Sequence, residues 1–447
     1  MIDWIMHGAS ARRGAGTGRG RGAGTGRGVY AVGEQDDHED IFPVVENEGG
    51  GHWQAPADLE RRLYKLTAVD ESYTYLRALA HHGVYHPMPI EQTTRAPGER
   101  RLWTSEVTGS DGVVRTMTQV YTDGVLPPPH PYVVYEFITL GTLADVVPPE
   151  VDVLVVNAAT PCQVMFQVDD EEREVWSDLH EELFDPEGLL NRVVTRFTGA
   201  PGSGPLLHGL ACGAHLCYYN GDPWNTLDWH GAGYSSEVER LEDFWDVGDR
   251  EDWLEIQQRL LECEVSPWYW DFVLGARLAL RKEHGDRGPV DAGLWRDCVE
   301  STLRRVVEAP EGAEFETFIA DMREMVGKIL RYEARFRADG LLGPDETVRT
   351  IAAWDLGRGS KMARWGRGAR YATRAEMYDA LQRVSAGVRG TYTSWAEFSA
   401  AYVMGRCLHF DDEHFGDWYT SVLEAHHALT RAPRSPWNTV PFQLPTS

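Results

Sequence analysis

The chain has 447 residues, of which 42% are hydrophobic and 25% are charged, the composition of an ordinary globular protein. A chain of this length exceeds one ordinary hydrophobic core, so we expect two or three domains. The formal net charge of −26 argues against nucleic-acid and anionic-membrane binding, because the field of the whole molecule would repel polyanions. No run approaches the roughly 20 apolar residues of a membrane span, and the N-terminus lacks the apolar core of a signal peptide. We therefore expect a cytoplasmic protein.

Residues 1–56 are predicted to be a disordered tail, first Gly/Arg-rich and then acidic. A seven-residue motif, Gly-Ala-Gly-Thr-Gly-Arg-Gly, occurs at 14–20 and again at 22–28, and such a repeat cannot bury apolar surface. Its glycines do not match a dinucleotide-binding fingerprint, because no strand precedes them and no helix follows. We favour an inert tail, or a start codon assigned too far upstream, over a nucleic-acid-binding arm of the RGG type.

Residues 57–197 are predicted to form a mixed α/β module. Two short helices begin it, and Asp58 is expected to cap the first. Three segments rich in Val and Tyr then have the composition of strands: Val84–Met88, Val113–Tyr121 and Tyr132–Phe137. Val151–Val156 is a continuous apolar run, typical of a central strand that is covered on both faces.

This order of elements, with a buried strand that ends in an Asn-x-x-x-Pro turn, resembles the N-terminal domain of the enhanced-serine-sensitivity family, SseB. The resemblance covers residues 57–195. It rests on Val84-Tyr85-His86-Pro87, on Val120-Tyr121-Thr122, and on Val155-Val156-Asn157 with Pro161. The chain departs from the family pattern by its Pro127-Pro128-Pro129 insertion. The resemblance implies a small interaction module rather than a catalytic one.

Residues 198–205 are predicted to be a linker, because Gly, Ser and Pro supply turn geometry and no core. Residues 206–442 are predicted to be a helical domain, since apolar residues recur at helical spacing from Asp249, Trp268, Trp295 and Phe315 onward. The expected fold class is therefore α+β, an N-terminal mixed α/β sandwich-like module followed by a mostly α-helical domain.

A cluster of potential metal ligands opens the helical domain: His208, Cys212, His215 and Cys217. The first three would share one helix face, and four nitrogen and sulfur ligands can hold zinc tetrahedrally. However, Cys217 points elsewhere if the helix continues, and the neighbouring leucines have the character of core residues. We favour small buried cysteines beside core histidines, and we expect no metal and no cofactor.

Three consecutive helices near the C-terminus carry charges on their inner faces. Thr373 with Glu376, and Ser394 with Glu397, form capping boxes that fix the start of the second and third helices. In the first helix Asp355 lies on the apolar stripe, where an unpaired charge would cost several kcal/mol or more.

We expect Asp355 to pair with Arg406 from the third helix, and otherwise with Arg358 one turn along its own helix. The candidate catalytic residues are Asp355, Arg358, Arg364 and Arg406. The favoured alternative to a catalytic site is a buried ion-pair network that fixes the register of the helices.

The same region resembles the bacterial family called domain of unknown function 1266. The motifs that carry the resemblance are Trp354-Asp355-Leu356-Gly357-Arg358, Ala363-Arg364-Trp365-Gly366, Tyr371 with Glu376, Ser394-Trp395, Tyr402 with Gly405-Arg406, and Ser435-Pro436-Trp437. Upstream, Trp245-Asp246-Val247 with Asp249-Arg250-Glu251 is similar to the entry helix of the family. The resemblance covers residues 205–442 and implies no established activity.

Between Arg349 and Arg389 the chain has nine basic and three acidic residues, an excess of positive charge within an acidic protein. We expect this patch to bind an acidic surface, either that of the chain's own N-terminal domain or that of a protein partner, and a solvated face without a ligand is the alternative. The candidate binding residues are Lys361, Arg364, Trp365, Arg367 and Tyr402.

The sequence contains no G-x-S-x-G, P-loop or H-E-x-x-H motif. The leading hypothesis is therefore a non-enzymatic interaction protein, of the accessory or immunity kind, that binds another protein. The alternative is an enzyme that acts on a phosphorylated or carboxylated small molecule through the Asp/Arg set. The two hypotheses differ in where the arginines point, because catalysis requires a solvent-connected pocket and a scaffold requires a dry helix interface.

Overall fold

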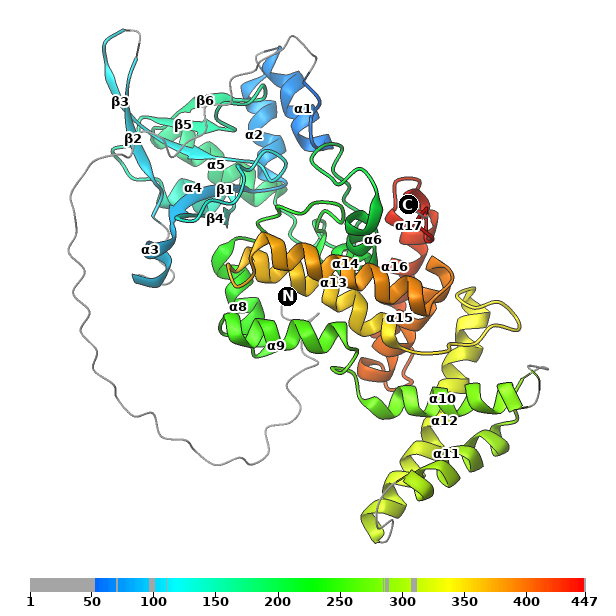
Figure 1. The fold of residues 1–447 in the computed structure, drawn as a ribbon. Coiled ribbons are helices and arrows are strands. Elements are labelled where there is room, and N and C mark those ends of the chain that lie inside the picture. The colour runs from blue at the N-terminus through cyan, green and yellow to red at the C-terminus, as the bar shows by residue number, and fades with distance from the viewer. Residues whose placement is uncertain are drawn as a thin grey trace, which may run out of the picture.

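Figure 1 shows the computed structural model of the chain. It describes residues 53–69, 71–95, 101–109, 111–283, 285, 289–306 and 312–445, so the predicted tail lies outside the described residues except for 53–56. An α/β module is followed by a helical domain, and the predicted α+β fold class is confirmed. Within the described ranges, no helix has the length and apolar character needed to cross a membrane.

The α/β module contains five helices and six strands in the part of the chain that is described. They are α1 (Asp58–Thr67), α2 (Ser72–Ala80), β1 (Val84–Pro89), α3 (Ile90–Arg95), β2 (Thr104–Thr108), β3 (Val114–Val120), β4 (Val133–Ile138), α4 (Leu140–Val146), β5 (Val153–Val156), β6 (Val164–Gln167) and α5 (Asp170–Leu183). The cap of α1 is Ala57, and Asp58 is instead its first helical residue, so the predicted cap is wrong by one position.

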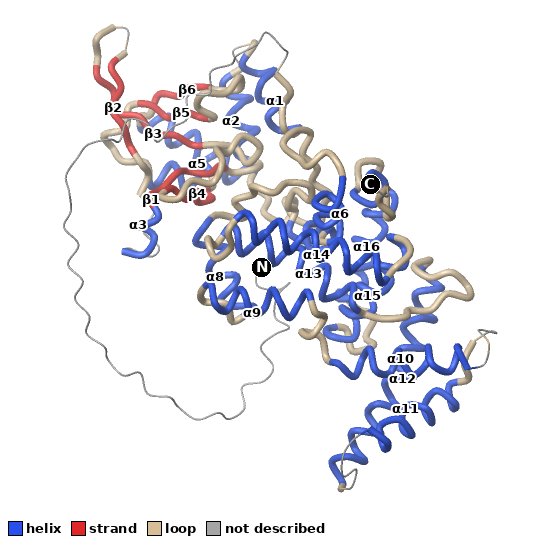
Figure 2. Tube along the Cα trace, in the orientation of Figure 1, coloured by secondary structure: helices blue, strands red, loops and turns tan. Residues whose placement is uncertain are grey.

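Four strands form a sheet in the order β2-β3-β5-β6, in which β3 and β5 are parallel and the other pairs are antiparallel. The antiparallel pair β1-β4 joins this sheet through a bridge between Tyr85 and Tyr121. As predicted, β5 is a central strand. Its Leu154 and Val156 belong to one hydrophobic core with Trp176 of α5. Figure 2 shows α5 beside the strands of the sheet.

Twelve helices follow in the described ranges. They are α6 (Gly204–Cys212), α7 (Ala214–Asn220), α8 (Tyr234–Trp245), α9 (Arg250–Leu261), α10 (Trp268–Glu283), α11 (Ala292–Val306), α12 (Ala313–Asp339), α13 (Ala352–Gly368), α14 (Arg374–Thr391), α15 (Trp395–Phe410), α16 (Asp417–Arg431) and α17 (Pro436–Thr439). Helix α13 lies at the centre and contacts α6, α7, α8, α9, α14 and α15. Helices α10, α11 and α12 form a three-helix projection at the end of the molecule opposite the α/β module (Figure 1).

The helix caps follow from local sequence. The predicted capping box of α14 is present, because Thr373 and Glu376 each bond the backbone of the other. In α15, Ser394 accepts from the Glu397 N–H as predicted, but the Glu397 carboxylate accepts from the backbone N–H of Thr393 and from Arg349. The predicted bond from the Glu397 N–H to Ser394 is therefore confirmed. The predicted return bond to Glu397 from the Ser394 N–H is replaced by bonds from Thr393 and Arg349.

The chain leaves the α/β module before the predicted linker. Val194 forms a parallel bridge with Pro223, and the Arg196 backbone N–H donates to Asn225 at 2.8 Å, so this stretch already packs on the helical domain. Residues 198–203 form partly exposed bends, and α6 begins at Gly204.

The two units also touch through β4. Glu136 accepts hydrogen bonds from the Ser235 hydroxyl at 2.6 Å and from the Ser235 N–H at 3.1 Å, which places a carboxylate at the positive N-terminus of α8. Nearby, Tyr85 donates to the Gly231 carbonyl at 2.8 Å, and Arg370 after α13 donates to the Val133 carbonyl at 2.9 Å. The units are therefore joined by contacts that do not depend on the connecting segment.

These contacts predict that cleavage within residues 198–203 will leave the two fragments associated. The nicked protein should elute as one species in size-exclusion chromatography at moderate salt, because the β4–α8 interface persists. Glu136→Ala removes the acceptor for Ser235 and should increase the fraction that separates. Glu150→Ala, at an exposed position of the same module, is the matched control. Complete separation of the nicked wild-type fragments would contradict the prediction.

Candidate functional site

Helix α13, which is buried on all sides, carries four charged residues spaced by three positions: Asp355, Arg358, Lys361 and Arg364. All are buried, and Asp355 and Lys361 are each only 1% exposed. A spacing of three keeps successive side chains near one another on a helix. The site is therefore a line of charges inside the domain, and its properties depend on what neutralises each of them.

Asp355 is held by donors from its own helix and from the segment before α10. Arg358 donates to its carboxylate through Nη2. Ser266 donates its hydroxyl at 2.6 Å and its backbone N–H at 3.0 Å, and the Val265 N–H adds a fourth bond at 3.1 Å. The prediction that Arg406 pairs with Asp355 is wrong. The alternative prediction, Arg358, is confirmed: it lies one turn along the same helix and forms the ion pair.

The next two basic residues of the line fasten α13 to the end of α7. Lys361 forms an ion pair with Asp222. Arg364 donates to the Pro223 carbonyl at 2.7 Å and to the Cys217 sulfur at 3.3 Å. Both side chains therefore bind the turn that follows α7.

Arg406 of α15 is 2% exposed and lies among aromatic rings rather than carboxylates. Its guanidinium carbon is 4.4 Å from the ring centroid of Tyr219, 5.4 Å from that of Phe410 and 5.3 Å from that of Trp418. One turn earlier, Tyr402 stacks on His215 with ring centroids 4.2 Å apart. The motif residues of α15 therefore build an aromatic and cationic interior.

Two glycines let α13 and α15 approach closely. A Cβ on Gly357 would lie 2.8 Å from the Tyr402 ring, and a Cβ on Gly405 would lie 2.5 Å from the Trp354 Cβ. No side chain fits at such distances. The Gly357 and Gly405 positions of the sequence motif are thus explained by packing.

The structure brings the candidate binding residues together in the interior rather than on a surface. Lys361, Arg364, Trp365 and Tyr402 are buried, and Arg367 is half-buried. A partner in solution cannot contact buried side chains in this arrangement. Arg370, a basic residue of the same region, contacts the α/β module by donating to the Val133 carbonyl.

Of the four potential metal ligands of α6 and α7, His208 and Cys212 contact each other, with the Cys212 sulfur 3.7 Å from the His208 Nδ1, and His215 and Cys217 have other partners. His208 contacts the Phe442 carbonyl at 3.0 Å, Cys212 donates to the His208 carbonyl at 3.2 Å, and Cys217 accepts from Arg364. His215 contacts the Ser399 hydroxyl at 3.1 Å. Among the residues that the structure describes, no group of three or more His, Cys, Asp or Glu side chains is placed to hold a metal ion.

Burial keeps these histidines neutral. Desolvation lowers the pKa of His208 to about 4, and the nearby Arg389 adds to the effect. Desolvation also lowers the pKa of His215 well below its ordinary value, with further contributions from His426 and Arg406. At neutral pH both rings therefore act as hydrogen-bonding and stacking groups without charge.

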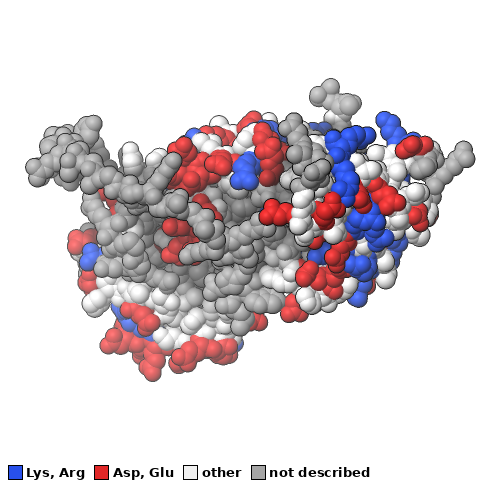
Figure 3. Space-filling model, turned by 90° about the horizontal axis from the view of Figure 1, so that it is seen from below, with Lys and Arg blue, Asp and Glu red and all other residues white. Residues whose placement is uncertain are grey.

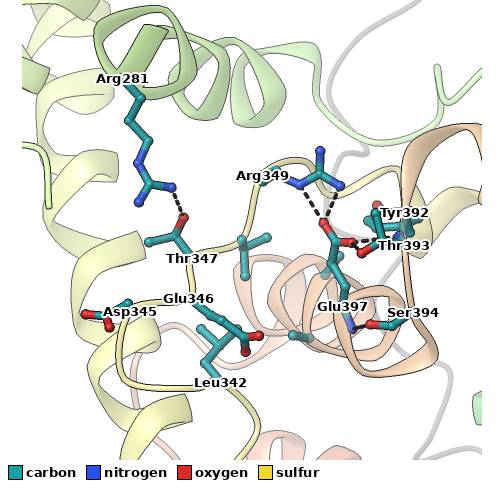
Figure 4. Close-up of a pocket in the computed structure, with 13 residues that line it drawn as sticks. Arg281, Leu342, Asp345, Glu346, Thr347, Arg349, Tyr392, Thr393, Ser394 and Glu397 are labelled. Atoms are coloured by element: carbon teal, nitrogen blue, oxygen red, sulfur yellow. Dashed lines mark hydrogen bonds and ion pairs between the residues drawn. The ribbon is translucent and has the colours of Figure 1, made fainter. Parts of the chain in front are cut away.

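A cleft of about 330 Å³ lies elsewhere, between the segment after α12 and the start of α15 (Figure 4). Arg349 and Glu397 line it and form an ion pair, in which the Arg349 Nε donates to Glu397 at 2.5 Å, and Thr393 donates its hydroxyl to Glu397 at 2.8 Å. The cleft is not lined by Asp355, Arg358, Arg364 or Arg406. The four candidate catalytic residues therefore point into a helix interface and not into this cleft.

Comparison of the sequence with models of known protein families gives a match within the helical domain. This domain is an α-helical unit built around the α13 and α15 motifs, and residues 240–442 match the model of a family described as "Protein of unknown function (DUF1266)". The C-terminal resemblance expected from the sequence is thereby confirmed over this range. No curated protein and no solved structure matches the chain. The likeness of the α/β module to SseB stays a prediction.

Replacing Asp355 should destabilise the helical domain. Asp355→Ala leaves Arg358 buried without its carboxylate, and breaking a buried pair in this way costs about 3–5 kcal/mol. Denaturant unfolding followed by circular dichroism measures the loss. The matched control is Asp379→Ala, which removes an exposed carboxylate 3.9 Å from Arg383 and should change stability by less than about 0.5 kcal/mol. Equal free energies of unfolding for the two variants would show that the Asp355–Arg358 pair does not stabilise the helical domain.

Stability should also fall in acid because of His208. The pKa of its ring in the folded state is about 4, below the value of about 6.5 in an unfolded chain, so the unfolded state binds more protons between these values. The stability that the neutral His208 ring contributes is fully present above pH about 6.5 and is lost as the pH falls toward 4. Unfolding at several pH values should show a smaller acid loss for His208→Gln. His414→Gln, at an exposed position, should behave as wild type, and an unchanged slope in His208→Gln would refute the assignment.

Proposed function

We propose that this chain is a non-enzymatic protein-interaction protein, of the accessory or immunity kind, that acts in the cytoplasm. The observation that carries the proposal is an exposed tryptophan within an aromatic cluster on the three-helix projection, whose other three rings are partly buried. We call Trp268, Tyr269 and Phe272 of α10 with Phe318 of α12 the aromatic surface. Trp268 is 61% exposed, and among the described tryptophans it is the one on the surface.

The rings of the aromatic surface are mutually packed. The Trp268 centroid is 5.7 Å from that of Phe272 and 6.1 Å from that of Phe318, and Tyr269 lies 6.3 Å from Phe318. Packing of this kind holds the rings in place before a partner arrives, which lowers the entropy lost on binding. Tryptophan and tyrosine are also the residues that dominate the binding energy of protein interfaces.

Several charged side chains of α11 and α12 form ion pairs with one another. In Figure 3, which views the molecule from below, basic and acidic side chains are interspersed at the end that the projection occupies. Arg304 binds Glu316 at 2.7 Å, and Arg323 binds Asp297 at 3.0 Å and Glu300 at 2.8 Å. A protein partner is therefore favoured over a polyanion, since an exposed apolar cluster among neutralised charges is typical of protein interfaces.

The enzymatic alternative uses the Asp/Arg set on a phosphorylated or carboxylated molecule. Two observations count against it. Asp355 has four hydrogen bonds within the protein, which leaves little capacity for substrate, and Arg358 is engaged with it. In the cleft, the Glu397 carboxylate accepts from Arg349 and from the Thr393 N–H. It therefore stabilises the start of α15.

Affinity capture of the tagged full-length chain from its native cell tests the proposal. Wild type should retain one stoichiometric protein partner. The double variant Trp268→Ala and Phe318→Ala should lose that partner while its circular dichroism spectrum stays unchanged. Leu294→Ala removes an exposed apolar side chain from α11 and should retain the partner. Retention by all variants would exclude the aromatic surface, and recovery of a co-purifying metabolite alone would favour the enzyme.

A further inference from the structure

Helix α10 has a second apolar face, which the rest of the projection does not cover. Its first face is buried in the core of the helical domain. The second face holds one half-buried residue, Phe272, and four exposed ones, Trp268, Gly275, Leu278 and Ala279. Intervals of three and four residues place them along one side of the helix. A helix that is apolar on opposite sides is normally buried, so this face is suited to a further contact.

Gly275 lies at the middle of this face. A glycine in a helix interior lowers stability relative to alanine, so its presence there needs a reason. Gly357 and Gly405 are explained by close packing inside the domain. At Gly275 an added Cβ would meet no described atom within 4 Å. Packing within the described chain therefore does not require this glycine, which suits the close approach of another helix from outside.

The face is complementary to itself when two copies of α10 lie antiparallel and cross at Gly275. Residues at equal distances before and after the crossing point then face each other. Phe272, three residues before Gly275, faces Leu278 of the second copy, three residues after it. Trp268, seven residues before, faces the exposed Lys282, seven residues after, and an ammonium group over an indole ring is a favourable contact.

Charge favours this orientation over the parallel one. A parallel pair would place the two Lys282 ammonium groups side by side, where like charges repel. The antiparallel pair separates these groups. It also brings the positive N-terminus of each helix beside the negative C-terminus of the other.

We propose that the occupant of the aromatic surface is a second copy of this chain, docked antiparallel along α10 about a two-fold axis at Gly275. The inference rests on the proposed function, because it names the partner of the same surface. Such a contact uses one patch on both copies, so each residue contributes twice. Helix α10 has 16 residues and is about 24 Å long, which gives a contact at the small end of specific interfaces. The dimer should therefore dissociate on dilution.

Sedimentation velocity of the full-length chain over a concentration series tests the dimer. The weight-average mass of the wild type should rise from that of one chain toward that of two. Gly275→Glu places two like charges at the crossing point and should stay monomeric, and it should keep its fold because the new side chain points into open space. Gly390→Glu is the matched control. Gly390 is also an exposed helical glycine with no described atom within 4 Å of an added Cβ, so this variant should dimerise as wild type does.

Cysteine crosslinking locates the axis. Gly275→Cys places two thiols at the crossing point, within reach of a disulfide, so mild oxidation should give a covalent dimer. In Ala279→Cys the two thiols would lie on the order of 12 Å apart along the helices and should not join. The unsubstituted chain measures the background from its own cysteines.

Three results would each overturn the inference: a wild type that is monomeric at every concentration, a Gly275→Glu variant that dimerises as wild type, or crosslinking of Gly275→Cys no greater than that of Ala279→Cys. A monomeric wild type that captures a different protein through Trp268 and Phe318 would leave the proposed function intact and refute the self-association alone. A monomeric wild type that captures no protein would refute both.

Discussion

The helical domain depends on the burial of one charged helix. Residues 353–366 of α13 are all buried, and three basic residues and one acidic residue lie among them. A helix with such an inner face is stable only if the rest of the fold supplies partners, because each unpaired buried charge costs several kcal/mol. The segment before α10 supplies donors to Asp355, and the turn after α7 supplies acceptors to Lys361 and Arg364.

The same helix connects the two ends of the molecule. Before its N-terminus, the Ile351 N–H donates to Asp271 of α10 at 2.9 Å, and after its C-terminus Arg370 bonds β4 of the α/β module. Figure 1 shows α13 between the three-helix projection and the α/β module. This buried helix therefore has contacts with both the three-helix projection and the α/β module.

Charges and aromatic rings thus have different roles inside and outside the domain. In the interior, arginines stack on rings, as Arg358 does on Trp354 at 4.4 Å and Arg277 on Trp295 at 4.4 Å. Each such contact contributes about 0.5–2 kcal/mol and orients a cation that also makes ion pairs. On the projection, Trp268 is exposed, while Tyr269, Phe272 and Phe318 are partly buried against the core. The interior arrangement fixes the fold, and the proposed binding function belongs to the surface.

The sequence alone determined the fold class, the central strand β5, the capping box of α14, and the presence of Asp355 on an inner face, because these depend on periodicity and on contacts within a few residues. It also predicted that Asp355 needs a cation. Only the tertiary structure decided that the cation is Arg358, that Lys361 and Arg364 face inward, and that Trp268 is exposed. Helical spacing shows which residues share a face but not which face meets another helix, so the sequence predicts a surface patch where the structure buries the charges of α13. The partner of each buried charge was fixed by loops distant in sequence, at Asp222, Pro223 and Ser266, which no local pattern could indicate.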